Sequence, residues 1–584
     1  MIFNLNNSME QNLKRKNVFD FMSIIVNSIW FLLFLCGLNL LVMHYYILNS
    51  CQDTILDATC YADNVVGVYF DVCAIYILVW LLILRKTKIS LSLLFLITWL
   101  WSFSNIMYSR FFFNYLTLSA IGQGESLIDD LILRCIFANF RWIDLYYPLV
   151  AVLFFYFLSK LHVGNIPAFR KLLVGLFLIA LVDLGVYVAY CLSDSRLRYA
   201  SFFLHKVYSN NFIEHLNYSN PNLSHFLRGE IRNIIPELWA DIKGNIELTE
   251  TELREIRIVK TEAQNSMTSE LSGATPKNLI FILIESYMSF TSDLKISGKE
   301  VTPFLNSLKN SPGTYYNGNV NTNVTLGCSS DGQFIYMTGL LPLRSIVTLS
   351  RATHVTLPGM PKQLKYKSRM VIPTVKSVWD QDRMCEKYGF NELYTSLDYS
   401  EDHDNTLTDE QVFELAIQKD VASNQPFFSV VLTISMHQPY TKQIDLDFVI
   451  DNSSMQSELA CYLNACHYTD KQIEKYIRLL KEHGLYDNSI IVIAADHPVF
   501  SYDFGDPEKH IPLYIINSSG LPKDMWRGEC NQVDVYTTLL DLLGCKSNWY
   551  GLGHSLVSPE YKNSVSDRTW NVSEWIIMGD YFSK

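Results

Sequence analysis

The feature that most constrains this chain is a set of five long apolar runs, all within its first third. They lie at residues 21–41, 68–84, 91–107, 147–161 and 172–192. A helix needs about 20 apolar residues, and at least about 17, to cross the hydrocarbon core of a bilayer. The fourth run is the shortest, and Pro148 marks its beginning. Any one run could be a buried helix of a soluble domain, but the five together predict a membrane domain with five spanning helices.

The charged residues between these runs predict which side of the membrane each connection faces. Basic residues precede the first run, fill the second connection and flank the fourth run: Lys14, Arg15, Lys16, Arg85, Lys86, Lys88, Lys160, Arg170 and Lys171. The first connection contains no lysine or arginine, and it carries Asp53, Asp57 and Asp63. Because basic residues mark cytoplasmic connections, the chain is expected to begin in the cytoplasm. With five spans, everything after residue 192 is then expected outside the cytoplasmic membrane of a bacterium.

The overall composition excludes some classes of protein. The net charge is −11 and there is no basic tract, so nothing indicates a nucleic-acid partner. The twelve cysteines lack the spacing of zinc-finger ligands, and the sequence does not assign disulfides among them. The first apolar run is followed by further runs and not by a small-residue cleavage site, which is not the pattern of a cleavable signal peptide.

Two segments without long apolar runs complete the first half of the chain. Residues 110–142 are apolar and aromatic but interrupted, which predicts interfacial helices on the outer leaflet within a transmembrane domain spanning residues 1–192. Residues 193–275 are polar and show helical spacing, for example at 248–262, where Thr249 or Thr251 could cap a helix. We interpret this segment as a helical connector. A flexible linker is the alternative, but leucine, isoleucine and tryptophan are frequent there.

The pattern changes at residue 276, where short β-branched runs begin to alternate with helical stretches. Residues 278–284, 427–434 and 489–494 are nearly continuous apolar strands, and residues 461–483 read as a helix that Gly484 ends. Strands of this kind belong to a parallel sheet covered by helices on both faces. The fold class is therefore an α/β catalytic domain at residues 276–584, preceded by an all-α membrane domain.

Each of the three strands is followed by a polar side chain suited to chemistry. Glu285 follows the first strand, His437 comes shortly after the second, and Asp496 and His497 follow the third. Parallel strands place their carboxyl ends at one edge of the sheet, where ligands of α/β proteins bind. Two carboxylates and an imidazole suit Mn²⁺ or Zn²⁺. The alternatives are a glutamate that begins a helix and an Asp-His pair in a capped turn.

A fourth element, residues 325–343, supplies candidate nucleophiles. Its sequence TLGCSSDGQFIYMTGLLPL passes from small, polar residues into an apolar helical stretch. A helix beginning there would expose a hydroxyl, and its backbone N–H groups would favour an anion such as phosphate. Cys328, Ser329 and Ser330 are the candidates. Helix capping by one of the serines is the structural alternative.

Seven segments of the chain share their order and spacing with a known family. They are IESYMSF, TPFLNSL, CSSDGQFIYMTGLLP, VWDQDRMCEKYGF, LTISMHQPY, YLNACHYTDKQIEKYIRLLKEHGLYDNSIIVIAADH and QVDVYTTLLDLLG. Together they resemble the lipoteichoic acid synthase family of the alkaline-phosphatase/sulfatase superfamily. The resemblance runs along nearly the whole chain. It implies five membrane spans followed in the chain by a sulfatase-like catalytic domain outside the membrane.

The resemblance also implies roles for individual residues. It implies a divalent metal held by Glu285, Ser329, Asp496 and His497. Mn²⁺ is the expected ion, with Zn²⁺ and Mg²⁺ as alternatives. Ser329 matches the nucleophile and His437 the histidine near the reacting phosphate, and three positions are assigned to the substrate: Trp379, Gln381 and Asp331.

The chain departs from the family pattern at two of these positions. Ser329 stands where the family has threonine, which preserves the hydroxyl. Gln381 stands where the family has arginine, and a neutral amide cannot make the charge-assisted pair of hydrogen bonds that arginine makes with phosphate. The second departure leaves the head group and the acceptor open, because it removes a charge at the substrate.

These residues predict transfer of a phosphoglycerol head group from a phospholipid to a glycan or glycolipid acceptor through a phospho-Ser329 intermediate. The donor would be phosphatidylglycerol, or phosphatidylethanolamine in the rival phosphoethanolamine transferase. A sulfatase is disfavoured because the segment at Cys328 lacks the proline and arginine needed for formylglycine formation. A non-catalytic receptor is disfavoured by the complete site, and a transporter by the scarcity of ionisable residues in the runs, of which Asp183 is the clearest.

Overall fold

The structure is a computed structural model of the 584-residue chain. It describes residues 29–50, 58–83, 86–112, 115–116, 140–161, 245–268, 277–344, 346–399, 406–438, 448, 457–500, 504, 508–518 and 528–583. The chain divides into a helical unit, Met1–Leu116 with Asn139–Trp239, and a sheet unit, Thr117–Ala138 with Ala240–Lys584. The predicted domain boundaries after residues 192 and 275 fall at stretches outside the described residues, so they stay predictions.

The described part of the helical unit consists of long apolar helices. They are α2 (Ile29–Ser50), α3 (Ala58–Leu82), α4 (Thr87–Phe112), the short 3-10 helix η2 (Trp142–Leu145) and α7 (Tyr146–Lys160). Four candidate spans follow from their length and hydropathy: Ile29–Asn49, Asn64–Leu82, Thr87–Arg110 and Trp142–Lys160. The described parts of the first four predicted runs therefore lie in helices long enough to span. The fifth, residues 172–192, lies outside the described residues.

The helical unit packs as a membrane bundle does, with apolar side chains outside and polar contacts inside. Leu82, Leu149 and Val152 are exposed, which suits lipid and not water. Inside, the Ser102 hydroxyl donates to the Asn39 carbonyl over 2.6 Å. Most of the predicted interfacial segment 110–142 lies outside the described residues. Its first residue, Arg110, is buried near the end of α4.

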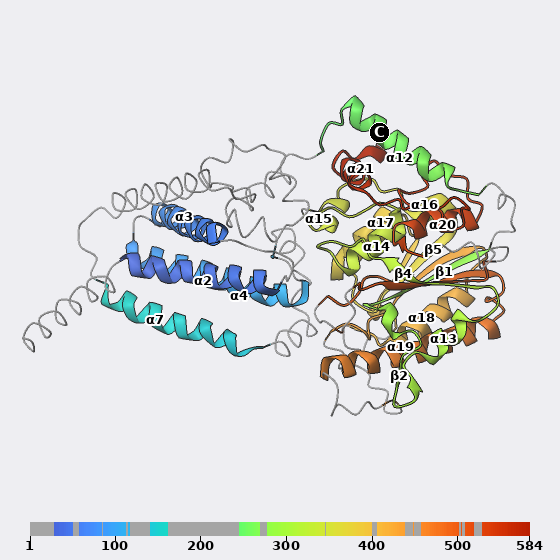
Figure 1. Ribbon diagram of the computed structural model, residues 1–584, viewed down its shortest axis with the longest axis horizontal. Coiled ribbons are helices and arrows are strands. Elements are labelled where there is room, and N and C mark those ends of the chain that lie inside the picture. The colour runs from blue at the N-terminus through green and yellow to red at the C-terminus, as the bar shows by residue number, and fades with distance from the viewer. Residues whose placement is uncertain are drawn as a thin grey trace, which may run out of the picture. The chain divides into compact units, whose positions relative to one another are not determined.

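The sheet unit is built on one eight-stranded sheet in the order β10-β4-β9-β8-β1-β7-β5-β6 (Figure 1). The strands are β1 (Asn278–Ile284), β4 (Thr314–Asn321), β5 (Lys367–Val371), β6 (Glu392–Tyr394), β7 (Phe427–Leu432), β8 (Ser489–Ala495), β9 (Ile511–Ile516) and β10 (Cys530–Asn531). A separate hairpin is formed by β2 (Lys295–Ile296) and β3 (Lys299–Glu300). All pairings in the large sheet are parallel except the two that β9 makes with β4 and β8. The predicted parallel sheet is thus confirmed apart from β9.

Helices cover both faces of this sheet (Figure 1). One face carries α13 (Pro303–Lys309), α18 (Asp409–Val421) and α19 (Ser457–Glu482). The other carries α14 (Ser329–Thr338), α16 (Met360–Leu364), α17 (Gln381–Tyr388) and α20 (Asp534–Leu542), with α15 (Thr348–Ala352) and α21 (Asp567–Met578) completing the unit. Because the sheet is covered on both sides, β1 and β8 are buried at every residue.

The described part of the connector is a helix that packs on the sheet unit. Helix α12 (Glu250–Asn265) contacts α21, and Arg568 of α21 forms ion pairs with Glu255 and Glu262. Thr249 is its N-cap and forms a reciprocal capping box with Glu252, which decides between the two predicted caps.

Candidate metal and nucleophile site

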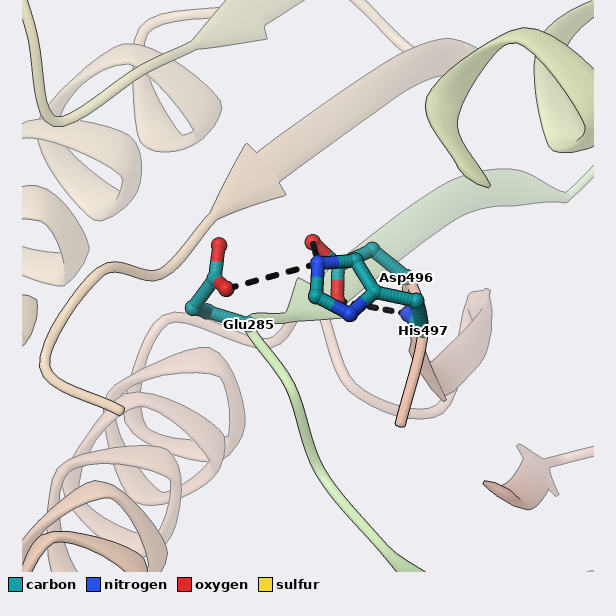
Figure 2. A group of neighbouring side chains, drawn as sticks. All are labelled: Glu285, Asp496 and His497. Carbon is teal, nitrogen blue, oxygen red and sulfur yellow. Dashed lines mark hydrogen bonds and ion pairs between the residues drawn. The ribbon is translucent and has the colours of Figure 1, made fainter. Parts of the chain in front are cut away.

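Two adjacent strands bring Glu285, Asp496 and His497 together. In the parallel pairing of β1 with β8, Ile284 lies opposite Ala495, so Glu285 and Asp496 leave the sheet side by side. Figure 2 shows the three side chains facing one another. Their ligand atoms all lie within 4.8 Å of one another, and His497 Nε2 is 3.6 Å from Glu285 Oε1 and 3.7 Å from Asp496 Oδ2. All three side chains are buried. We refer to Glu285, Asp496 and His497 together as the carboxylate–imidazole cluster.

Surrounding hydrogen bonds orient the cluster. The backbone N–H groups of Ser286 and His497 donate to Asp496 Oδ1 over 2.8 and 2.7 Å, which leaves Oδ2 toward the imidazole. His497 Nδ1 lies 2.8 Å from the Pro498 carbonyl oxygen, so Nδ1 carries the proton and Nε2 presents its lone pair to the cluster. Such a bond on the second ring nitrogen is typical of histidines that bind metals.

Of the three candidate nucleophiles, only Ser329 reaches the cluster. Its Oγ lies 3.0 Å from His497 Nε2 and donates to Glu285 Oε2 over 3.2 Å. The Ser330 hydroxyl instead donates to the Gly327 carbonyl. Cys328 is buried, and burial raises the pKa of its thiol well above the usual value, so it stays protonated.

The local backbone explains how Ser329 is presented. Ser329 is the first residue of α14, and Cys328 before it has a φ of +43°, in the left-handed region that residues with a side chain rarely adopt. This turn points the first hydroxyl of the helix back toward the ends of β1 and β8. Gly332 comes so close to the Asp496 backbone that a Cβ there would lie 2.3 Å from its carbonyl oxygen. The helix and the strand end therefore pack in direct contact.

The electrostatics of the cluster favour a cation. Burial and the negative charge of Glu285 raise the pKa of Asp496 to about 7. Burial alone would also raise the pKa of Glu285, but the nearby imidazoles of His437 and His497 outweigh burial and lower it. For His497, burial lowers the pKa, whereas the two carboxylates raise it and prevail. Two buried carboxylates thus compete for one imidazole.

These residues fit a divalent metal. The set offers two carboxylate oxygens, one imidazole nitrogen and the adjoining Ser329 hydroxyl, a mixed oxygen and nitrogen set that suits Zn²⁺ or Mn²⁺. A cation there would offset the repulsion between Glu285 and Asp496. Among the residues that the structure describes, this is the one group of His, Cys, Asp and Glu side chains with ligand spacing.

His437 lies on the turn that follows β7, and this turn is tied to the cluster. The Glu285 N–H donates to Thr433 Oγ1 over 3.1 Å, and the Thr433 N–H donates to the Leu283 carbonyl over 3.0 Å. His437 Nδ1 lies 2.7 Å from the Gln438 carbonyl, and the ring is half-buried. The imidazole of His437 is near enough to lower the pKa of Glu285.

A buried carboxylate that the sequence did not reveal holds the same turn. Asp409, at the start of α18, accepts hydrogen bonds from the N–H groups of Ile434 and Ser435 over 2.8 and 3.0 Å. Its other oxygen accepts from the Thr469 hydroxyl over 2.7 Å. From sequence alone, an aspartate at the start of a helix is interpreted as a helix cap. The partners of Asp409 lie 25 or more residues away, so no local sequence pattern predicts its role in holding the turn.

Gln381 and Trp379 lie at the start of α17. Gln381 is buried and forms a reciprocal amide pair with Gln333, with Nε2–Oε1 distances of 3.0 and 2.8 Å. Gln333 lies one turn after Ser329 on α14, so the pair links the two helices. Trp379 is half-buried and has a φ of +56°. Strained backbone of this kind accumulates at functional sites, which agrees with the predicted substrate role but does not test it.

Asp331, which the resemblance assigns to the substrate, lies inside the protein, and its substrate role stays a prediction. Its side chain is fully buried, and Oδ2 accepts hydrogen bonds from the N–H groups of Thr325 and Gly327 over 2.9 and 3.0 Å. It therefore braces the loop that precedes Ser329. A second brace that the sequence did not reveal is Gln532, which donates to the Asp496 carbonyl over 2.7 Å.

Comparison with known proteins agrees with this geometry. The sulfatase family model matches residues 277–545, which run from β1 to just beyond α20. The chain is 25% identical over 524 residues to lipoteichoic acid synthase 2 of Bacillus subtilis, covering 83% of this chain and 77% of that protein. It is 27% identical over 522 residues to the lipoteichoic acid synthase of Staphylococcus aureus, covering 84% and 76%.

One solved structure is similar over both units. It is the integral membrane lipooligosaccharide phosphoethanolamine transferase A of Neisseria meningitidis, with a TM-score of 0.56 at 13% identity, covering 91% of this chain and 98% of that chain. At this identity the likeness shows a shared fold. The family resemblance of the sequence motifs is thus confirmed: residues 277–545 match the sulfatase family, most of the chain is similar to lipoteichoic acid synthases, and these likenesses support a phosphotransferase enzyme.

Proposed function

We propose that this protein is a membrane-anchored, metal-dependent transferase that moves a phosphoglycerol head group from a phospholipid to a glycan or glycolipid acceptor. The observation that carries the proposal is the position of the Ser329 hydroxyl, within hydrogen-bonding distance of both His497 and Glu285 at the carboxyl edge of the sheet. A nucleophile beside a metal-ligand set suits covalent phospho-transfer. The lipoteichoic acid synthases among its relatives support the phosphoglycerol head group.

The first half-reaction uses Ser329 as nucleophile. A divalent cation, Mn²⁺ in our proposal, would be held by Glu285, Asp496, His497 and Ser329, where it would lower the pKa of the serine hydroxyl and offset charge on the phosphate oxygens. The hydroxyl proton passes to solvent water, which leaves the Ser329 oxygen as an alkoxide. The Ser329 oxygen bonds to phosphorus, and the bond from phosphorus to the diacylglycerol oxygen breaks.

His437 serves as the general acid. The diacylglycerol oxygen leaves with both bonding electrons and takes a proton from the His437 imidazole, which makes the leaving group neutral. In the second half-reaction an acceptor hydroxyl gives its proton to His437 while its oxygen bonds to phosphorus. The bond between phosphorus and Ser329 then breaks, which restores the serine alkoxide and the protonated histidine.

The membrane anchor agrees with a lipid donor. We propose that the protein is a multi-pass protein of the bacterial cytoplasmic membrane and that its sheet unit lies outside the cytoplasm. The four candidate spans support the membrane anchor. The orientation rests on the basic residues of alternate connections together with the fifth predicted run, residues 172–192, because an odd number of spans takes a chain that begins in the cytoplasm to the outside. Phosphatidylglycerol is the proposed donor, and it would reach the site from the outer leaflet.

One observation favours a second candidate, a phosphoethanolamine transferase acting on a lipid A-like or glycan acceptor. Gln381 replaces an arginine of the family pattern, and the Gln333–Gln381 pair leaves both amides neutral and mutually satisfied. A site without that positive charge would tolerate the cationic head group of phosphatidylethanolamine. The shared fold with the Neisseria transferase is compatible with this candidate.

Intact-mass analysis of the purified protein distinguishes these candidates. The protein in detergent, supplied with Mn²⁺ and either phosphatidylglycerol or phosphatidylethanolamine, is compared with Ser329→Ala and with Ser330→Ala as the matched control. Diacylglycerol release is measured in the same samples. We expect a glycerol-phosphate adduct with phosphatidylglycerol, present in Ser330→Ala and absent from Ser329→Ala.

The other outcomes are equally informative. A phosphoethanolamine adduct lost in Ser329→Ala would establish the second candidate. An adduct that persists in Ser329→Ala would contradict the assigned nucleophile. Neither adduct nor diacylglycerol, with metal bound, would overturn both candidates.

A further inference from the structure

A second cavity lies at the same edge of the sheet as the carboxylate–imidazole cluster. It is open to solvent and has a volume of about 580 Å³, within the usual size range of ligand pockets. Its walls come from the segment after β1, the end of α13, strand β4 and His510, which precedes β9. Because β9 is antiparallel to β4, the start of β9 lies at the carboxyl end of β4. Ligands of α/β proteins bind at this edge.

The cavity is connected to the cluster by two short segments of chain. Ser289 on its wall follows Glu285 by four residues, which can span at most about 14 Å. The Ser289 N–H donates to the His510 carbonyl over 2.9 Å, and His510 Nε2 lies 3.1 Å from Asn321 Oδ1. Asn321 ends β4, and the chain reaches Ser329 eight residues later. Glu285 of the cluster and the nucleophile Ser329 are therefore each only a few residues along the chain from the cavity walls.

The charges of the cavity are matched in pairs. The Lys309 ammonium forms an ion pair with Asp293, and His510 Nδ1 lies 3.4 Å from Glu508 Oε2. Among the described residues that line it, each basic side chain thus has an acidic partner. A site for phosphate needs surplus positive charge or a bidentate donor, and this cavity presents neither. The pairing indicates a ligand without net charge.

The remaining lining supplies hydrogen-bonding groups beside aromatic rings. Strand β4 has an irregular register between Asn317 and Val320, and the Asn319 N–H donates to Asn317 Oδ1 over 2.7 Å. This irregularity turns the exposed Asn319 onto the cavity wall, as bulges near functional sites do. Tyr316 and Phe290 supply rings at the same wall. Amides, hydroxyls and rings together suit a molecule with many hydroxyl groups and apolar C–H faces.

We propose that this cavity binds the neutral saccharide part of the phosphate acceptor. The proposal rests on the proposed function and specifies its acceptor class. Binding there holds the acceptor within reach of phospho-Ser329, so that a saccharide hydroxyl and not water takes the phospho-group. The saccharide belongs to a glycolipid head group or to a soluble glucan, since both present the same chemistry to the cavity.

Ligand-observed NMR on the full-length protein in detergent tests the proposal. The probes are maltotetraose, cellotetraose and laminaritetraose as soluble glucans, diglucosyl diacylglycerol as a glycolipid, and glycerol phosphate as the charged comparison. Asn319→Trp fills the cavity, and Asn319→Ala removes only the amide. Gln418→Trp on α18 is the matched control, because Gln418 is an exposed amide on another element.

We expect at least one saccharide to bind the wild type, Asn319→Trp to weaken binding at least about tenfold, Asn319→Ala to weaken it less, and Gln418→Trp to leave it unchanged. Binding of the glycolipid alone or of the glucans alone identifies the source. The proposal is overturned if no saccharide binds, if both Asn319 variants bind as the wild type does, or if only glycerol phosphate binds. Diacylglycerol release by the wild type, measured separately, shows whether the proposed function itself holds.

Discussion

The carboxylate–imidazole cluster of the sheet unit and the Arg110–Asp144 pair of the helical unit both hold charged side chains away from water, but they balance the charges differently. Arg110 Nη1 and Nη2 donate to the two oxygens of Asp144 over 2.9 and 2.7 Å, and side-chain exposure is 1% and 0%. One charge of each sign is satisfied within the protein. In the cluster, two carboxylates face one imidazole at 3.6 and 3.7 Å.

This difference separates a structural role from a functional one. A balanced, bidentate ion pair leaves no polar group for a ligand to satisfy, so it fixes the ends of α4 and α7. An unbalanced buried cluster raises the pKa of one member, Asp496, to about 7, and such shifts concentrate at functional sites. The imbalance is the physical reason to expect a cation at the cluster and none at the pair.

The largest expected effect comes from removing one charge of the cluster with Glu285→Gln. We expect activity to fall roughly 10³-fold or more, because a metal ligand and a charge near phosphorus are lost together. Thermal stability without Mn²⁺ should change little, because relief of the repulsion with Asp496 offsets the lost attraction of the Glu285 carboxylate to His437 and His497. The rise in Tm on adding Mn²⁺ should disappear, although saturating metal stabilises the wild type by about 2.7 kcal/mol at a hundred times Kd.

The check is diacylglycerol release together with Tm, with and without Mn²⁺. Glu474→Gln, at an exposed position of α19, is the matched control and should behave as the wild type. An unchanged Mn²⁺ effect on Tm in Glu285→Gln would mean that the cation binds elsewhere.

At the Arg110–Asp144 pair, in contrast, removal of one charge is expected to lower the stability of the fold. Arg110→Met leaves the Asp144 carboxylate buried without its partner, which should lower stability by about 3–5 kcal/mol. The Arg141 N–H, which donates to Asp144 over 2.7 Å, offsets only part of the charge. Arg110→Met with Asp144→Leu should recover most of the loss. Unfolding in detergent measures both, and equal losses in the single and double variants would show that the pair is not the origin.

The comparison also shows what the sequence could predict. The apolar runs of β1 and β8 ended at Glu285 and Asp496, and parallel pairing was enough to bring these side chains together. The small residues before α14 marked Cys328, Ser329 and Ser330 because a helix beginning there must expose a hydroxyl, and the family resemblance chose Ser329 among them. These predictions succeeded because each depends on local pattern and on one rule of sheet geometry.

Other features depend on tertiary contacts that leave no local trace. The segment Ile511–Ile516 is apolar, and an apolar strand has the same composition in a parallel or an antiparallel pairing. The antiparallel direction of β9 could therefore not be predicted from it. The Gln333–Gln381 pair joins residues 48 positions apart, and each glutamine alone reads as a surface residue. The resemblance assigned Asp331 to the substrate, but no local pattern reveals that its side chain accepts hydrogen bonds from the N–H groups of Thr325 and Gly327 inside the protein.

Asp470 is intermediate between the carboxylate–imidazole cluster and the Arg110–Asp144 pair. It is a buried carboxylate that accepts hydrogen bonds from backbone N–H groups and has no ion-pair partner among the described residues. It accepts from Phe304 and Leu305 over 2.9 and 2.8 Å, yet burial raises its pKa to about 7. The folded protein then holds a proton that the unfolded chain, with a pKa near 3.8, loses between pH 4 and 7. Asp470 therefore stabilises the fold fully at the acidic end of this window, and the contribution is lost as pH rises through 7.

Asp470→Asn should abolish this dependence. The difference in unfolding free energy, variant minus wild type, should rise between pH 4 and 7 by up to about 4 kcal/mol and stay constant above that range. Denaturant unfolding at a series of pH values measures it, and Asp487→Asn, next to the exposed end of α19, serves as the control. A flat difference across the window would mean that backbone donors alone keep Asp470 ionised.

The smallest effect is expected at Asp409, whose carboxylate acts on the reaction only through the turn that carries His437. Asp409→Asn keeps an oxygen for the Ile434 and Ser435 N–H groups but turns an amide toward the Thr469 hydroxyl, which must then accept. The turn is loosened and not lost. We expect about a tenfold lower kcat with the natural lipid, well below the loss on removing a general acid altogether.

The leaving group distinguishes this positioning role from a general loss of structure. Diacylglycerol needs a proton from His437 as it departs, whereas p-nitrophenol, released from a p-nitrophenyl ester of glycerol phosphate, does not. Asp409→Asn should therefore slow the lipid reaction and leave release of the phenol nearly unchanged, and His437→Ala should show the same selectivity in stronger form. If both substrates slowed equally, Asp409 would support the fold around α18 and not the histidine. The buried carboxylates discussed here would then have only two roles, binding a cation or stabilising the structure. None of them would position the general acid His437.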